Sequence, residues 1–516
     1  MSSARARREA RCGRRRSRVG LGLAVVAAML ALRADAQPPP DTSSRVAGAD
    51  TLRVSLGACV ERAIAVGEEM RLAEADLASA RGAYQQARSD VFPHLTLSGG
   101  YTRQIESVFR GDGGDFQVQP FEPDTLAPLE DRVRDLENAL PTASLATLGS
   151  LFESFANENI WTGSAGVTQK VFEGGGILAA VRVAKHALGS FESRLADREA
   201  EVRMLVREAY VAALLGDRSE EIAKLGLEQA ETQLQRVRAR HAVGDAAEFD
   251  LLQAEVQRDN LIPTLTAARN ARAIAYLQLA GIANLPVGVP IVLTTPLLDR
   301  AELPPDPFAV LDTVGVVAAA LDNAMITALQ QELEARRQAV TVAGSDAWPA
   351  LSLFANYSKQ AYPSDVWPER GDWRTDANAG VLLSWDVFDG LRTRGAVNQS
   401  AAEVTRTQQI LEQEREWVQL AVAREIGELD RAAEELRSRT RTVQVARRAF
   451  ELATLRYEEG ASSLLEVEDA RVAQQVAQLS EARARHDYYV ALARLERYSD
   501  RPLFTRLVEQ MGGESE

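Results

Sequence analysis

Cysteine, histidine and aromatic residues are scarce in this sequence, and basic residues are outnumbered by acidic ones. The 516 residues include two Cys, four His and 6% aromatic residues, with 59 Lys and Arg against 73 Asp and Glu. Two cysteines cannot staple a disulfide-dependent fold, and the scattered histidines do not supply a structural zinc domain. A net charge of −14 offers nothing to neutralise phosphate groups, so we expect no nucleic-acid partner.

Catalytic motifs and long apolar runs are also missing. The chain has no Gly-rich phosphate loop with Lys, no HExxH and no G-x-S-x-G, so we predict no enzyme, no cofactor and no metal site. Beyond the N-terminal segment, no stretch reaches 18 consecutive apolar residues, which excludes a transmembrane helix there. Such a chain could cross a membrane only as a β-barrel, in which every backbone polar group is paired.

The N-terminal residues 1–36 have the pattern of a secretory signal peptide. A basic run precedes the apolar run 19–32, and Ala34-Asp35-Ala36 is a small-x-small cleavage pattern. The apolar run is short for a bilayer crossing, and an N-terminal anchor is the alternative. Removing this segment, with its nine Arg and two acidic residues, would change the net charge from −14 to −21. A flexible segment, 37–50, is expected to follow.

The remaining sequence is a duplicated unit. SDVFPHLTLSGGYT at 89–102 matches SDAWPALSLFANYS at 345–358, and VFEGG at 171–175 matches VFDGL at 387–391. AVGDAAEFDLLQAE, which starts at Ala242, matches EEGASSLLEVEDAR, which starts at Glu458. We therefore predict two structural repeats. Their expected bounds are 51–281 and 313–497, with a Pro-rich connector at 282–312 and a tail at 498–516.

Each repeat has the predicted order helix, strand, loop, strand, long helix, tight turn, helix. The opening helices, expected at 55–90 and 313–345, end before a Phe-Pro and a Trp-Pro pair, because proline disfavours a helical residue before it. The long helices are expected at about 175–240 and 391–458. Their apolar residues recur mostly at intervals of seven, as from Leu411 to Val418 and, after one step of four, from Val422 to Leu429, and this spacing indicates coiled-coil packing. The returning helices have about half the length of the long ones, as do the opening helices.

The strands alternate between apolar and polar residues. Leu95, Leu97 and Tyr101 share one face, and Leu353 and Tyr357 repeat the pattern. Four strands of about ten residues suit a bilayer crossing but cannot close a barrel alone, so the chain must oligomerise. Two copies would give eight strands and three would give twelve, which could leave a pore. The first repeat has 40 additional residues within 104–160, expected to form a surface loop with a short helix in 126–157.

The duplicated strand-to-helix corner and the duplicated turn together resemble the TolC-type outer-membrane efflux channel family. RYEEGASSLLEVEDA at 456–470 is close to that family's turn pattern, and the resemblance covers about 50–497. It implies a mainly α fold with a small β part: a duplicated helical coiled-coil barrel and four transmembrane strands per chain. It also implies a homotrimer with a twelve-stranded β-barrel in outer-membrane lipid and the helical part in the periplasm. A periplasmic adaptor protein and an inner-membrane pump are the implied partners.

The resemblance also assigns residues to sites. Tyr457, Glu466, Asp469 and Asp250 would belong to the periplasmic entrance, and Gly244 and Gly460 to the turns that contact the adaptor. The acids could equally be a solvated helix face, and the glycines are turn formers in either case. Ser462 stands where the family often has a basic residue that tethers the closed tip. The strand-to-helix corners carry the following residues: Phe172, Gly174, Phe388 and Gly390.

The function implied is the exit duct of a tripartite efflux system in the outer membrane. Two alternatives remain open from the sequence. One is the outer-membrane component of type I protein secretion, which would use the same duct. The other is a periplasmic helical adaptor or scaffold, although no lipoyl-like β-domain flanks the helices. The sequence does not identify the transported substrate.

Overall fold

The structure is a computed structural model of the chain. It describes the following residues: 51–105, 126–138, 158–244, 246–286, 288–298, 313–363, 365–499 and 504. The predicted signal peptide, 1–36, and the segment 37–50 lie outside the described residues, as do 299–312 of the predicted connector and most of the tail. The chain divides into two units, Met1–Leu52 and Arg53–Glu516, and every described helix lies in the second.

The elements follow one another in the same order in both halves of the chain. The first half contains α3 (Leu56–Val66), α4 (Glu68–Ser89), β2 (His94–Arg103), β3 (Asn159–Glu173), α6 (Gly176–Ala242) and α7 (Glu248–Ile282). The second contains α9 (Thr313–Ala320), α10 (Ala324–Ser345), β5 (Ala350–Ala361), β6 (Trp373–Ser384), α11 (Arg392–Glu458) and α12 (Leu464–Ser499). Two short strands, β1 (Leu52–Val54) and β4 (Ile291–Leu293), complete the order. The prediction of a mainly α fold with a small β part is confirmed.

Both opening helices are interrupted, so the predictions of single helices at 55–90 and 313–345 are wrong. Gly67 separates α3 from α4 with a ψ of 140°, and its N–H still donates to the carbonyl oxygen of Ala63. A Cβ at Gly67 would lie 2.2 Å from that oxygen, so only glycine fits this break. In the second half, the Asn323 side chain accepts a hydrogen bond from the Ile326 N–H at 2.8 Å. This N-cap starts α10 as a new helix after α9.

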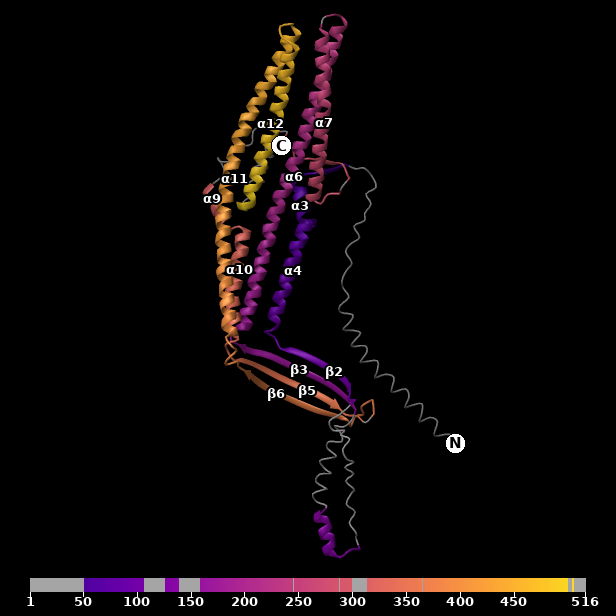
Figure 1. Cartoon of the computed structure of the whole chain (residues 1–516), viewed down its shortest axis with the longest axis vertical. Helices are drawn as coiled ribbons and strands as arrows, with labels where there is room; N and C mark the ends of the chain where they lie inside the picture. The colour runs from indigo at the N-terminus through magenta and orange to yellow at the C-terminus, as the bar shows by residue number, and fades with distance from the viewer. Residues whose placement is uncertain are drawn as a thin grey trace, which may run out of the picture. The chain divides into compact units, whose positions relative to one another are not determined.

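Each long helix packs against two shorter ones. α4 and α7 both contact α6, α10 and α12 both contact α11, and α6 also contacts α10 and α12. The heptad positions Leu411, Val418, Val422, Leu429 and Leu436 are all buried. The predicted coiled-coil seam of the second long helix is therefore confirmed. Figure 1 shows the turns after α6 and α11 at one end of these helices and the sheet at the other.

The four longer strands form one antiparallel sheet in the order β2-β3-β5-β6. Its register aligns Leu95 with Val167, and Val167 with Ala355, so that the apolar positions of neighbouring strands share a face. Thr96 aligns with Gly166, and Gly166 with Asn356, on the opposite face. The predicted alternation of apolar and polar faces is confirmed.

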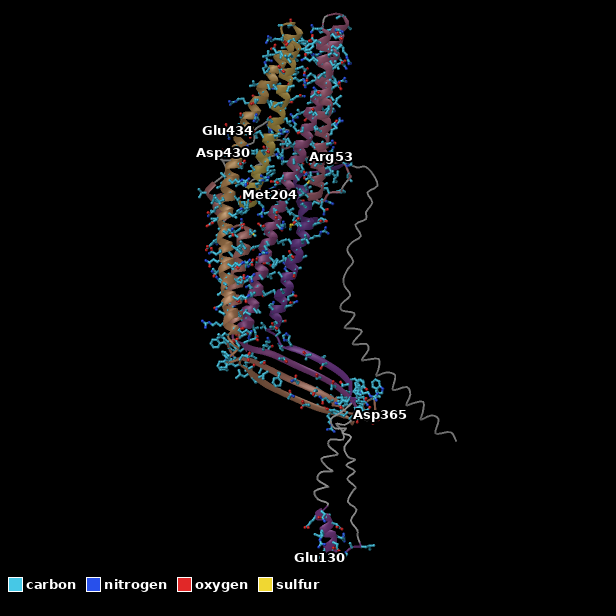
Figure 2. The ribbon with its side chains drawn as sticks, in the orientation of Figure 1. Arg53, Glu130, Met204, Asp365, Asp430 and Glu434 are labelled. Carbon is cyan, nitrogen blue, oxygen red and sulfur yellow. The ribbon has the colours of Figure 1, made fainter. Side chains whose placement is uncertain are left out.

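The apolar face of this sheet is exposed. Leu95, Leu97 and Leu383 have 67–69% of their surface accessible to solvent. Aromatic rings gather at both ends of the strands, one group beside Asp365 (Figure 2). There Trp161 lies 4.9 Å from Tyr101 and stacks on Trp367 at 5.3 Å. Among the helices that the structure describes, none is long and apolar enough to cross a membrane.

Candidate functional site: the hairpin turns and the strand-to-helix corners

The two turns that end the long helices are built around glycine. Gly244 has a φ of 80° and Gly460 a φ of 72°, in the left-handed region that side chains disfavour. A Cβ at either position would meet nothing within 4 Å, so backbone conformation and not space selects glycine. Both glycines are exposed. They are therefore open to a partner, and the turn role alone already accounts for the residue type.

The first hairpin, between α6 and α7, is held by polar contacts beside its turn. Arg238 of α6 forms an ion pair with Glu255 of α7 at 2.7 Å. His241 Nδ1 lies 3.0 Å from the carbonyl oxygen of Ala246 across the turn. Asp250 is half-buried in the first turn of α7, where a helix N-terminus favours negative charge.

The second hairpin, between α11 and α12, has an ion pair between two residues of its turn region. Arg456 donates to Glu466 at 2.8 Å, so the charge of this predicted entrance acid is offset within its own hairpin. Glu466 is half-buried in the first turn of α12, whereas Asp469 is exposed. The Ser462 hydroxyl donates to the carbonyl oxygen of Ala453 at 3.4 Å, which ties the turn to α11.

The ends of the two hairpins are packed against each other. Leu234 and Val237 of α6, Ala254 of α7 and Leu464 of α12 form one buried cluster, and Tyr457 of α11 packs against it. The guanidinium of Arg240 lies over the Tyr457 ring, 5.3 Å from its centroid. Arg236 of α6 forms an ion pair with Glu458 of α11 at 3.1 Å. Tyr457 therefore lies at the junction of the two hairpins.

A buried ion pair lies further along the contact between α6 and α12. Arg471 and Glu468 are 2.7 Å apart, and their side chains are only 3% and 4% exposed. Arg471 also donates to Gln475 at 3.0 Å, and Gln475 packs on Gly226 so closely that a Cβ there would lie 1.4 Å from its Nε2. Next to this pair, a groove of about 320 Å³ is lined by α6, α11 and α12. The contact between α6 and α12 therefore includes both a closely packed region and a groove.

The strand-to-helix corners also require left-handed backbone. Gly174 has a φ of 56°, and a Cβ there would lie 2.6 Å from the carbonyl oxygen of Ser345. Gly390 has a φ of 68° and is followed by Leu391 at 69°. Phe172 and Phe388 beside these glycines are 47% and 82% exposed, so neither ring belongs to the core of this chain.

Asp389 caps the start of α11 at the second corner. Its carboxylate accepts hydrogen bonds from the hydroxyl and the N–H of Thr393, the latter at 2.8 Å. These bonds favour the charged form and hold the pKa of Asp389 below its usual range. The carboxylate thereby satisfies the N–H of Thr393, one of the first N–H groups of α11, which have no partner within the helix.

The structure adds Arg236, Arg240 and Glu458 to the residues that the sequence singles out. A signal for one of them was present, because Arg240 and Arg456 both precede a turn glycine by four residues. The partner of each arginine could not be read from this spacing, since one forms a cross-hairpin contact and the other an ion pair within its hairpin. Within the part of the chain that the structure describes, no three His, Cys, Asp or Glu side chains are grouped as metal ligands.

Comparison with curated proteins identifies two relatives from Pseudomonas aeruginosa. The chain is 28% identical over 299 residues to the pyoverdine export outer membrane protein OpmQ, covering 57% of this chain and 60% of that protein. It is 23% identical over 309 residues to the alkaline protease secretion protein AprF, covering 60% of this chain and 63% of that protein. The match thus spans less than two thirds of the length of each of these relatives.

A solved structure shares the fold over most of its length. The outer membrane protein VceC from Vibrio cholerae aligns with a TM-score of 0.64 and 17% identity, covering 86% of this chain and 96% of VceC. This likeness supports the arrangement of the helices and strands in this chain.

The model of the family described as outer membrane efflux protein matches residues 60–285 and 316–499, which include both hairpins and all four longer strands. The predicted location in the outer membrane, with the helical part in the periplasm, is thereby confirmed. The family match also confirms the prediction that the chain is not an enzyme. The resemblance seen in the duplicated corner and turn is confirmed as well, and the chain belongs to the outer membrane efflux protein family.

Proposed function

We propose that this chain is the outer-membrane exit duct of a tripartite efflux system and passively conducts substrates from a periplasmic entrance to the outside. The observation that carries the proposal is the family match over both halves. The sheet supports it independently, because its apolar face is exposed along Leu95, Leu97 and Leu383. Exposed apolar patches of this kind mark contact with lipid or with another protein.

The duct is a homotrimer in this proposal. The sheet of one chain ends at β2 on one side and β6 on the other, and an unpaired strand edge is not tolerated in lipid. Pairing β2 of one copy with β6 of the next would close three sheets into a twelve-stranded barrel. The apolar face would then contact outer-membrane lipid, and the polar face with Thr96 and Asn356 would line the pore.

The chain divides functionally as its repeats do. A signal peptide at 1–36 and the segment 37–50 precede the first repeat, 51–281. The connector 282–312 leads to the second repeat, 313–497, and a tail follows at 498–516. In each repeat a corner, with Phe172 and Gly174 or Phe388 and Gly390, redirects the chain from the membrane strands into a periplasmic helix. The exposed turns at Gly244 and Gly460 would contact a periplasmic adaptor that is bound to an inner-membrane pump.

The entrance lies at the hairpin turns. Asp250 and Glu466 occupy the first turns of the two returning helices, and Asp469 is exposed one turn beyond Glu466. In a trimer each acid would appear three times around a narrow opening, and such rings favour cations. The bond of Glu466 to Arg456 weakens its contribution, so Asp469 is the stronger candidate for setting cation preference.

The closed entrance is held by contacts between the two hairpins. Arg236–Glu458 and Arg240–Tyr457 join α6 to α11 within one chain. They take the place of the tether that a basic residue at position 462 would supply, since the Ser462 hydroxyl bonds to Ala453 of its own hairpin. Opening would separate the hairpins and break both contacts.

A second candidate is the outer-membrane component of type I protein secretion. The observation in its favour is the relative AprF, which is an alkaline protease secretion protein. Both functions use the same duct and differ in the adaptor and pump that engage it. Co-purification of the chain with its adaptor, followed by identification of the attached pump, would separate the two.

Planar-bilayer recordings test the entrance. Glu466→Ala together with Asp469→Ala should weaken cation selectivity and block by divalent cations, by about two-fold or more, because the ring of charge is removed. The matched control is Asp430→Ala with Glu434→Ala, two acids on α11 away from the turns (Figure 2). Equal recordings from both double variants would remove Glu466 and Asp469 from the entrance. A protein that forms no channel at all would contradict the duct itself.

A further inference from the structure

The insertion between β2 and β3 contains a helix at 129–138 with one apolar side. Leu129, Val133 and Leu136 are spaced by four and three residues, which places them in one stripe along the helix. They are 74%, 48% and 52% exposed. The other positions of this helix are polar or charged. The chain therefore presents an exposed apolar helix stripe.

The alternation of four and three is the spacing of a coiled-coil seam. Leu129 and Leu136 occupy positions of one type, d, and Val133 occupies the other, a. The flanking positions are then fixed: Arg132 falls at g and Glu137 at e. In a parallel coiled coil, a g residue faces the e residue five positions further along the neighbouring helix. Arg132 and Glu137 are five positions apart and opposite in charge, so this helix is complementary to a parallel copy of itself.

We propose that three copies of helix 129–138 pack as a short parallel coiled coil on the outer side of the trimer. The proposal rests on the homotrimer of the proposed function. β2 and β3 are antiparallel neighbours, so both ends of the insertion leave from the same end of the sheet. Threefold symmetry would then bring the three helices to that end with the same polarity. In this coiled coil, the apolar stripe of each helix packs against the same stripe of the other two copies.

The links to the sheet are long enough for the helices to meet. Residues 104–128 precede the helix and 139–158 follow it. At about 3.3 Å per residue, the shorter link has a maximum reach on the order of 60 Å. This limit exceeds the radius of a twelve-stranded barrel, whose strands are roughly 5 Å apart.

Tethering accounts for association of so short a helix. A helix of this length is marginal in water by itself, because forming its first turn is unfavourable. Attachment to one trimer makes the association of the helices intramolecular, and their effective concentration is then on the order of millimolar. Burial of the apolar stripes of the three helices would then stabilise the bundle, and so would the Arg132–Glu137 pairs. Free peptides of this length would not form such a bundle.

Cysteine cross-linking in the full-length protein tests the seam. Leu136→Cys places a thiol at the d position, and Asp131→Cys places one on the opposite side of the same helix. Cys59 is fully buried, so it leaves the assay undisturbed. Under mild oxidation we expect at least about five-fold more disulfide-linked dimer from Leu136→Cys, because d residues of neighbouring helices touch. Equal yields from the two variants would overturn the proposal.

Charge exchange tests the register. Arg132→Glu should lower cross-linking at position 136 several-fold, and adding Glu137→Arg should restore it, since the exchange re-forms the pair with opposite signs. Failure of the double exchange to restore the yield would rule out the parallel register. The mass of the detergent-solubilised particle separates the two levels of inference. A trimer without cross-links contradicts only the coiled coil, whereas the absence of a trimer contradicts the proposed duct.

Discussion

The middle of the helical part and its hairpin tips are held together by different kinds of contact. In the middle, Arg207 of α6 and Glu496 of α12 form an ion pair at 2.7 Å, with side chains only 9% and 13% exposed. Glu496 also accepts the backbone N–H of Phe504 at 2.7 Å, and the buried Phe504 ring lies 4.8 Å below the Arg207 guanidinium. At the tip, Arg236 and Glu458 are 54% and 52% exposed. The ion pair that joins α6 to α12 in the middle is thus buried, whereas the one that joins α6 to α11 at the tip is exposed to solvent.

This difference assigns stability to one region and movement to the other. Exposed ion pairs contribute little, commonly below about 1 kcal/mol, because water and salt screen them. Breaking a buried pair leaves an uncompensated charge and costs several times more. Contacts that lose little free energy when broken suit a junction that must open. Contacts that lose much suit the part that must stay closed. The ion pair at the tip can therefore break without loss of the helical body.

The largest effect is expected in the middle of the helices. Arg207→Ala removes the partner of the buried Glu496 carboxylate and the cation beside Phe504, and should lower the free energy of unfolding by about 3–5 kcal/mol. Denaturant unfolding of the purified protein in detergent, followed by circular dichroism, measures this loss. Arg236→Ala at the tip is the matched control and should cost less than about 1 kcal/mol. If the two losses are equal, the distinction between the two regions is wrong.

The sequence predicts the elements of this structure better than their contacts. Heptad spacing identifies the long helices and the buried seam through Val418 and Leu429, because this periodicity is local. The break at Gly67 was missed, since a glycine inside a helical pattern is compatible with a continuous helix. The duplicated sequence also identifies the turns at Gly244 and Gly460, because the pattern around each glycine is local.

Contacts between distant residues lie beyond such reasoning. Arg207 pairs with Glu496 and Arg236 with Glu458 across more than 200 residues of sequence, and the chain contains 59 basic residues that could serve. Selection among them depends on how α6 packs against α11 and α12. The entrance residues show the same limit, because the sequence assigns Glu466 to the site and does not reveal its bond to Arg456.

A smaller effect on stability, with a larger one on gating, is expected at the tip. Arg236→Glu turns an attraction between α6 and α11 into a repulsion, so the hairpins should separate more readily and channel conductance should rise about two-fold or more at low salt. Single-channel recording measures this change, and raising the ionic strength should diminish it. Adding Glu458→Arg should restore the closed behaviour. A conductance that is the same in the wild type, the single variant and the double variant would show that this pair does not hold the entrance.

The smallest effect concerns Glu425, a buried carboxyl of α11 in the middle of the helices. Burial raises its pKa, and the nearby charges of Arg494 and Arg424 only partly oppose this. The folded state therefore holds the proton more tightly than the unfolded state, so the stability from this group is complete below the ordinary pKa of glutamate and is lost as pH rises through the raised value. Glu425→Gln cannot ionise, and the variant should match the wild type at low pH and be slightly more stable at neutral pH. Unfolding midpoints between pH 4 and 8 measure the difference. Glu458→Gln, at the solvent-exposed tip, is the control. A Gln variant that is less stable than the wild type at neutral pH would mean that the arginines, and not burial, dominate at this site.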